Sequence, residues 1–206
     1  ELNNSLAPLK SLTSSAKKII DAPEHLSMLP NVLDTISDRI ESLHVFLTQY
    51  ATYARLPAPK MQSINLNELV RSVAGLMNVR GNISLSIIIV DGDKAQLEQA
   101  LLNLIKNASE SGSKLESIEV SLLEEHDQVI LKVTDSGQGM SEQQLQQALL
   151  PFYTTKHQGS GLGLALCNDI VIAHAGKLTI SNLYKEEQVS GLEVAISLPI
   201  SDKRKG

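Results

Sequence analysis

The sequence predicts an α+β protein in two parts: an N-terminal pair of helices, and a domain in which helices cover one face of a mixed sheet. From Leu29 onward, apolar residues recur at alternating spacings of four and three residues, which is typical of helices that pack in a bundle. Prolines then interrupt this pattern in the segment Arg55–Lys60. After that segment, helix-period patterns alternate with short β-branched runs such as Ile87–Val90, which favour strands.

Residues 1–55 are predicted to form a helical hairpin. The second helix has a heptad seam made of Leu29, Leu33, Ile36, Ile40, Leu43, Leu47, Tyr50 and Ala54. The first helix has a matching pattern, and the segment Asp21–Pro30 between the two contains turn residues. Two helices cannot bury two such seams alone, so we expect a homodimer in which two hairpins form a four-helix bundle. Packing of the seam against the rest of the same chain is the alternative.

Residues 56–61 are predicted to be a linker, and residues 62–206 a second domain. The expected elements are helices over Leu69–Met77, after Asp93 and over Leu162–Ala175, and strands over Ile83–Val90, Ile118–Leu123, Val129–Thr134, Leu178–Ser181 and Leu192–Leu198. The helix after Asp93 has one apolar face, made of Leu97, Leu101, Leu104, Ile105 and Ala108. This mixture predicts an α+β sandwich.

The composition excludes several classes of protein. The net charge of −5 argues against a nucleic-acid binder, and the single cysteine, Cys167, excludes a disulfide framework or a cysteine metal cluster. No apolar run reaches membrane-spanning length, and nothing resembles a signal peptide. The single cysteine also fits a reducing compartment, so we expect a cytoplasmic location. Because the chain begins with Glu1 rather than Met, we expect a fragment of a longer protein, which can have membrane helices.

Three segments indicate a site for a phosphorylated ligand. Asn103 and Asn107 lie one turn apart with Gln96 and Gln99 on the polar face of their helix, where a neutral amide oxygen suits Mg²⁺; a solvated face is the alternative. Asp135-Ser-Gly-Gln-Gly139 follows a predicted strand, so its carboxylate can accept a hydrogen bond from an exocyclic amine such as that of adenine. An ordinary turn is the alternative there.

The third segment, Gly159-Ser-Gly-Leu-Gly163, opens a predicted helix, where free N–H groups and close backbone approach suit phosphates. A flexible loop is the alternative. No buried strand leads into these glycines and no Gly-Lys-Ser/Thr follows them, which argues against dinucleotide-binding and Walker phosphate loops. Taken together and in this order, the three segments predict a pocket for ATP and Mg²⁺.

The chain resembles, over nearly all its length, the sensor histidine kinases, whose ATP domain belongs to the Bergerat-fold group shared with gyrase, Hsp90 and MutL. Residues 103–107, 135–139, 151–156 and 159–163 look like the N, G1, F and G2 boxes, with a short lid similar to that of the nitrogen-regulation-like branch. The resemblance implies that Asn107 holds Mg²⁺ and Asp135 binds the adenine amine. It implies a nucleotide site made of Asn103, Lys106, Asn107, Asp135, Gly137, Gly139, Phe152, Thr155, Lys156, Gly159, Ser160, Gly161, Leu162 and Gly163.

The N-terminus resembles the family's H box, His-Glu-x-x-Asn/Thr-Pro-Leu, at Glu1 and Asn4, so the phosphoacceptor histidine would immediately precede Glu1. The resemblance implies autophosphorylation, with Glu1 and Lys156 assisting, and transfer to an aspartate of a response regulator. It also implies that Asn4 positions water for a phosphatase reaction. The alternatives are an ATPase of the same fold without histidine transfer, and a degenerate module that binds nucleotide or a partner.

Overall fold

The computed structural model describes residues 2–83, 86–156 and 159–201. The chain divides into two compact units, one formed by residues 1–56 with 154–160 and the other by residues 57–153 with 161–206. Among the described residues, none of the helices combines the length and the apolar character that crossing a membrane would require.

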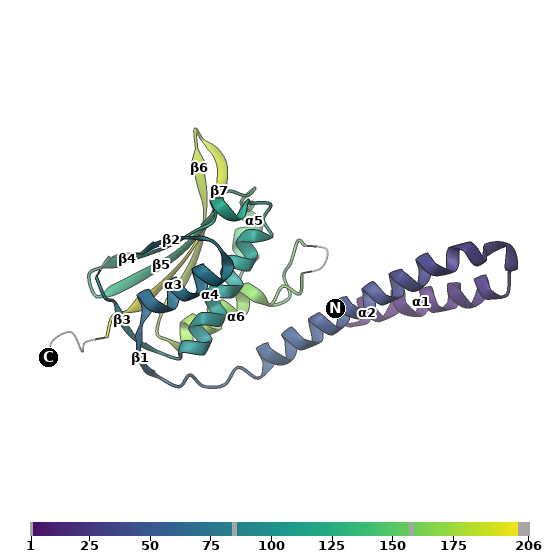
Figure 1. Cartoon of the computed structure of the whole chain (residues 1–206), viewed down its shortest axis with the longest axis horizontal. Helices are drawn as coiled ribbons and strands as arrows, with labels where there is room; N and C mark the ends of the chain where they lie inside the picture. Colours follow the sequence, from purple (N-terminus) through teal and green to yellow (C-terminus); the bar gives the residue numbers. More distant parts are fainter. Residues whose placement is uncertain (1, 84–85, 157–158, 202–206) are drawn as a thin grey trace. The chain divides into compact units, whose positions relative to one another are not determined.

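The first unit is built mainly from two long helices. Helix α1 (Leu2–Ile20) is followed by the short 3-10 helix η1 (Pro23–Met28) and by α2 (Leu29–Ala54), which contacts α1 (Figure 1). The α1–α2 contact leaves part of the apolar seam of α2 uncovered. Leu33, Ile40 and Leu47, spaced seven residues apart, remain between 43% and 54% exposed.

The second unit contains a five-stranded sheet in the order β2-β4-β5-β7-β6. Its strands are β2 (Arg80–Ile83), β4 (Glu119–Glu125), β5 (Gln128–Asp135), β6 (Lys177–Lys185) and β7 (Gln188–Pro199). The β2–β4 pair is parallel and the other pairs are antiparallel. A separate antiparallel pair joins β1 (Gln62–Asn65) to β3 (Ile89–Gly92).

Helices α3 (Leu66–Met77), α4 (Lys94–Ser109) and α6 (Gly163–Ala173) cover one face of this sheet (Figure 1). Burial alternates along β5, with Val129, Leu131 and Val133 facing the helices and fully or nearly fully buried. All five apolar residues predicted for α4 are buried, which confirms its apolar face. The α+β sandwich is therefore confirmed, and its core is aliphatic.

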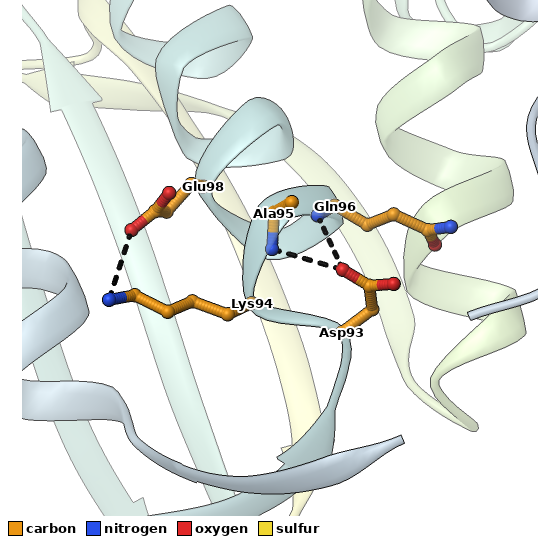
Figure 2. Close-up of polar contacts among 5 residues, drawn as sticks. All are labelled: Asp93, Lys94, Ala95, Gln96 and Glu98. Atoms are coloured by element: carbon orange, nitrogen blue, oxygen red, sulfur yellow. Dashed lines mark hydrogen bonds and ion pairs between the residues drawn. The ribbon is translucent and has the colours of Figure 1, made fainter. Parts of the chain in front are cut away.

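Helix α4 begins as the sequence predicts. The side chain of Asp93 accepts hydrogen bonds from the backbone N–H groups of Ala95 and Gln96 through Oδ1, at 3.0 and 3.2 Å (Figure 2). Lys94, the first residue of α4, forms an ion pair with Glu98 one turn later, with 3.7 Å between Nζ and Oε1. Asp93 is thus the N-cap of the helix on which the predicted amides lie.

The prediction of one strand over Ile83–Val90 is wrong. Ile83 ends β2 in the large sheet, whereas Ile89 begins β3 in the small one; Ser84 and Leu85 lie outside the described residues. The isoleucine-rich composition indicates strand propensity but does not say which partner each half pairs with. The sequence prediction also lacks β1 and the short helix α5 (Glu142–Gln147).

Candidate functional site

The C-terminal half of α4 contributes three of the predicted site residues. Asn103 and Asn107 are half-buried and Lys106 is exposed, with its Nζ 3.9 Å from Glu110 Oε1. Among the described residues, the amide of Asn107 has no hydrogen-bond partner. A methyl group on Gly163 would lie 3.7 Å from Asn107 Nδ2, so this amide faces the first residue of α6.

The polar face of α4 is less uniform than the sequence predicts. Gln96, expected on the same open face as Asn103 and Asn107, is only 5% exposed because the linker covers it. Its Nε2 donates to the carbonyl of Pro57 at 2.9 Å, and its Oε1 is buried without a partner among the described residues. Gln96 therefore holds the linker and does not belong to the candidate site.

Asn103 lies against α6. Burial raises the pKa of the Cys167 thiol to about 12, and a hydrogen bond with the Asn103 side chain lowers it only in part. The thiol also donates to the carbonyl of Ala100 at 3.4 Å. Cys167 therefore stays protonated and unreactive, and serves in packing α4 against α6.

Asp135 is the last residue of β5 and is 7% exposed. Its Oδ1 accepts hydrogen bonds from the backbone N–H of Gly137 at 2.7 Å and from Ser113 Oγ at 3.4 Å. Within the described residues, Oδ2 accepts none. The carboxylate is thus held through one oxygen and presents the other, as recognition of an amine requires.

The turn after Asp135 approaches its neighbours closely. A Cβ on Gly137 would collide with Ser111, lying 2.8 Å from its carbonyl oxygen, and Gly139 has a φ of +67° beside Asn182. Asn182, on β6, holds the end of the turn. Its Oδ1 accepts from the N–H of Met140 at 2.8 Å and its Nδ2 donates to the carbonyl of the same residue at 2.7 Å.

The start of α6 is held by another close approach. The N–H of Phe152 donates to the carbonyl of Gly161 at 3.0 Å, and both residues have positive φ angles, +68° and +67°. A Cβ on Gly161 would lie 2.6 Å from the carbonyl oxygen of Tyr153. Leu162 is buried, and within the described part of the chain no side chain caps the N-terminus of α6. The first N–H groups of α6 therefore form a positive end next to Asn107.

The remaining predicted residues belong to the other compact unit or fall outside the description. Thr155, Lys156, Gly159 and Ser160 belong to the other compact unit, where the N–H of Lys156 donates to Thr154 Oγ1 at 3.1 Å. Asn4 lies in α1, but its side chain is outside the description, and Glu1 lies outside the described residues altogether. The roles expected for these residues stay predictions.

Two sets of contacts join the sequence motifs. Asn107 on α4 faces Gly163 on α6, and the turn that follows α4 contacts Asp135 and Gly137 through Ser111 and Ser113. Sequence reasoning missed these two serines and Asn182. The small, polar Ser-Gly-Ser segment after α4 was the one sequence feature that pointed to the two serines. It does not reveal that they contact residues more than twenty positions later.

Residues 92–202 match the family described as histidine kinase-, DNA gyrase B-, and HSP90-like ATPases. The chain belongs to this ATPase family. Sporulation kinase C of Bacillus subtilis is 30% identical over 159 residues, which cover 72% of this chain and 37% of the relative. Sensor histidine kinase ZraS of Salmonella typhimurium is 28% identical over 210 residues, which cover 97% of this chain and 44% of the relative. The chain thus spans less than half the length of these curated relatives.

A solved structure extends the similarity over both units of this ATPase-family chain. The histidine kinase ThkA, crystallised in complex with the response regulator protein TrrA, is 25% identical with a TM-score of 0.69. The match covers 99% of this chain and 60% of the ThkA chain.

Proposed function

We propose that this chain is the ATP-binding and dimerising part of a protein-histidine kinase of a two-component signalling system. The observation that supports it most directly is that two polar side chains of the second unit, one carboxylate and one amide, are available to a ligand. Within the described part of the chain, Asp135 presents a carboxylate oxygen that accepts no hydrogen bond, and Asn107 presents an amide without a partner at the start of α6, which no side chain caps. The ATPase family and the relatives named as kinases support the same conclusion.

The residues present suit a magnesium–nucleotide complex. Asp135 Oδ2 would accept from the adenine amine, and the N-terminus of α6 with Gly161 and Gly163 would bind the phosphates. No group of three or more His, Cys, Asp or Glu side chains able to hold a metal exists among the described residues. The neutral amide oxygen of Asn107 suits Mg²⁺, which keeps phosphate oxygens and waters as its other ligands. When bound, Mg²⁺ would neutralise charge on the phosphates.

In the proposed reaction, a histidine immediately before Glu1 in the longer protein attacks the γ-phosphorus of ATP. A nitrogen–phosphorus bond forms, the bond to the bridging oxygen breaks and ADP leaves. Glu1 accepts the imidazole proton, and Lys156, with Thr155 beside it, stabilises charge on the phosphoryl oxygens. Asn103 and Lys106 approach the phosphates from α4.

The phosphoryl group then passes to an aspartate of a response regulator. The ThkA–TrrA complex supports a partner of this class, and we assign the docking surface to a four-helix bundle formed by two copies of α1 and α2. Asn4 would orient a water molecule for the reverse, phosphatase reaction.

Autophosphorylation with γ-labelled ATP and Mg²⁺ tests the proposal. This chain is compared with one extended by its natural upstream residues. We expect only the extended protein to incorporate label, and the label to be acid-labile and alkali-stable, as a phosphohistidine is. Binding of ATP by both proteins without label in either would contradict the proposal. Release of inorganic phosphate would then favour an ATPase, and no release would favour a nucleotide-binding interaction module.

A further inference from the structure

A turn of small polar residues that contacts the Asp135 turn has no role in the function described so far. It runs from Ser111 to Ser113, immediately after α4, and contacts the Asp135 turn at three points. Ser113 Oγ lies 3.4 Å from Asp135 Oδ1 and accepts the N–H of Ser136 at 3.1 Å. The third contact is the close approach of Gly137 to Ser111, which leaves no room for a Cβ.

The hydroxyl protons of this turn can be assigned by counting donors and acceptors. Ser111 Oγ lies 2.7 Å from the carbonyl of Ala108 and 2.8 Å from Ser113 Oγ, so its single proton can go to either. Because the N–H of Ser136 already donates to Ser113 Oγ, the proton of Ser113 points away from Ser136, toward Ser111 or Asp135. A hydrogen bond to an ionised carboxylate is roughly twice as strong as one between neutral groups, which favours the order Ser111 to Ser113 to Asp135.

We propose that Ser113 is a positioning residue that sets the selectivity of this site for adenine. Its hydroxyl, together with the N–H of Gly137, occupies Oδ1 of Asp135 and fixes the rotation of the carboxylate. Oδ2 is then directed away from the serine turn, available for the exocyclic amine of the base. The inference rests on the proposed function, because it assumes that this chain binds ATP.

The chemistry of the base gives a direct readout. Adenine has an amine at position 6, which donates to a carboxylate, whereas hypoxanthine has a carbonyl oxygen there, which a carboxylate repels. A correctly oriented Asp135 therefore favours ATP over ITP. A group that acts only on overall folding changes the affinity for both nucleotides alike.

The experiment measures the dissociation constants of ATP and ITP for the 206-residue chain and for Ser113→Ala. We expect the substitution to weaken ATP binding about fivefold and to leave ITP binding within about twofold, so that the ATP preference shrinks. Ser113→Thr, which keeps the hydroxyl, restores the preference. In an Asp135→Asn background, Ser113→Ala has no further effect on the ratio, since the two residues act through one contact.

Ser117→Ala is the matched control. Ser117 Oγ accepts from Ser136 Oγ at 2.7 Å on the same turn, but it does not reach Asp135, so its removal should leave the ratio unchanged. The ratio compares two ligands on one sample and is insensitive to a loss of folded protein. Equal weakening of ATP and ITP in Ser113→Ala, or no change in either, would overturn the inference alone. Binding of neither nucleotide by the unsubstituted chain would overturn the proposed function and the inference with it.

Discussion

Gly161 and Gly75 differ in what surrounds their Cα atoms. Because of this difference, we expect substitution by alanine to have opposite effects on stability at the two positions. Gly161 has a φ of +67° and faces the backbone of Phe152 and Tyr153, whereas Gly75 lies in α3 with nothing within 4 Å of the place that an alanine methyl would occupy. We expect Gly161→Ala to lower the free energy of unfolding by about 1–3 kcal/mol. Gly75→Ala should raise it by about 0.5–1 kcal/mol, because it removes glycine's extra unfolded-state freedom. Urea denaturation of both variants measures this, and equal shifts would contradict the assignment of strain to Gly161.

Asn107 is the residue whose substitution tests the metal assignment. Asn107→Ala removes the amide that faces Gly163, so the gain in ATP affinity on adding Mg²⁺ should fall about tenfold while binding without Mg²⁺ changes little. Titrations with ATP, with and without Mg²⁺, measure both affinities. Gln99→Ala on the same helix is the control, because it removes a half-buried amide that is not next to Gly163. An unchanged Mg²⁺ effect in Asn107→Ala would show that the metal ligand lies elsewhere.

At the scale of elements, the N-terminus of α4 links the linker to the site. Asp93 caps α4 through Oδ1, while its Oδ2 accepts the N–H of Lys60 at 2.9 Å. The N–H of Asp93 in turn donates to Nε2 of the buried His174, whose Nδ1 lies 2.7 Å from the carbonyl of Ile170. Nε2 of His174 is thus the acceptor for the backbone of Asp93, and Nδ1 faces the carbonyl of Ile170. One residue thus joins the linker, the start of α4 and the end of α6.

This arrangement predicts a pH dependence with a defined sign. Hydrogen bonding from the N–H of Lys60, and then from those of Gln96 and Ala95, holds the pKa of Asp93 below its usual value of 3.8. The stabilisation by the ionised group is therefore fully present above pH 3.8 and is lost as the pH falls through the lower folded-state pKa. We expect Asp93→Asn, which keeps one capping oxygen, to be less stable than the unsubstituted chain at pH 7.

Urea denaturation of the two proteins at pH 7 and at pH 3 and below checks this expectation. The difference in unfolding free energy should shrink as the pH falls, and groups that are distant from Asp93 and common to both proteins cancel in that difference. A gap that stays constant with pH would mean that the charge of Asp93 contributes nothing beyond its capping oxygen.

Elements that depend on residues close together in the sequence were predictable from it. Strands whose pairing partner lies far away in the sequence were not. The N-cap at Asp93 and the apolar face of α4 depend on residues within a few turns, and the structure confirms both. Helix α5 also had a local signal, the capping box formed by Ser141 and Gln144, which the sequence prediction overlooked. The division of Ile83–Val90 between two sheets had none, because β2 pairs with β4 almost forty residues later.

The same distinction applies to the site. Its glycines and amides stand in recognisable short motifs, so the sequence alone names Asn107, Asp135 and Gly161 as candidates, and their roles stay predictions. The groups that orient them come from segments without a motif: Ser113 lies 22 residues before Asp135, and Asn182 lies 42 residues after Met140. Only the sheet and helix packing brings these groups together.

At the scale of the whole molecule, the apolar seam of α2 is the basis for expecting assembly with a second copy. Leu33, Ile40 and Leu47 recur every seven residues and remain about half exposed although α1 packs on the same helix. A stripe with this spacing is typical of a helix that has another helical partner in a bundle. Among the described residues of this unit, no further long helix covers the stripe, so we expect two copies of the chain to bury it against each other.

Ile40→Glu tests the expected dimer because it places a charge in the middle of the stripe, on both copies at once. Loss of two buried isoleucine side chains should weaken the dimer about 100-fold or more, so that the variant sediments as a monomer where the unsubstituted chain sediments as a dimer. Asn31→Asp adds a carboxylate to the same helix at an exposed position off the seam and should leave the dimer intact. The site residues of the second unit are untouched, so ATP affinity per chain should not change. An unsubstituted chain that sediments as a monomer at micromolar concentration would contradict the assembly, and the seam would then need its partner from another part of the longer protein.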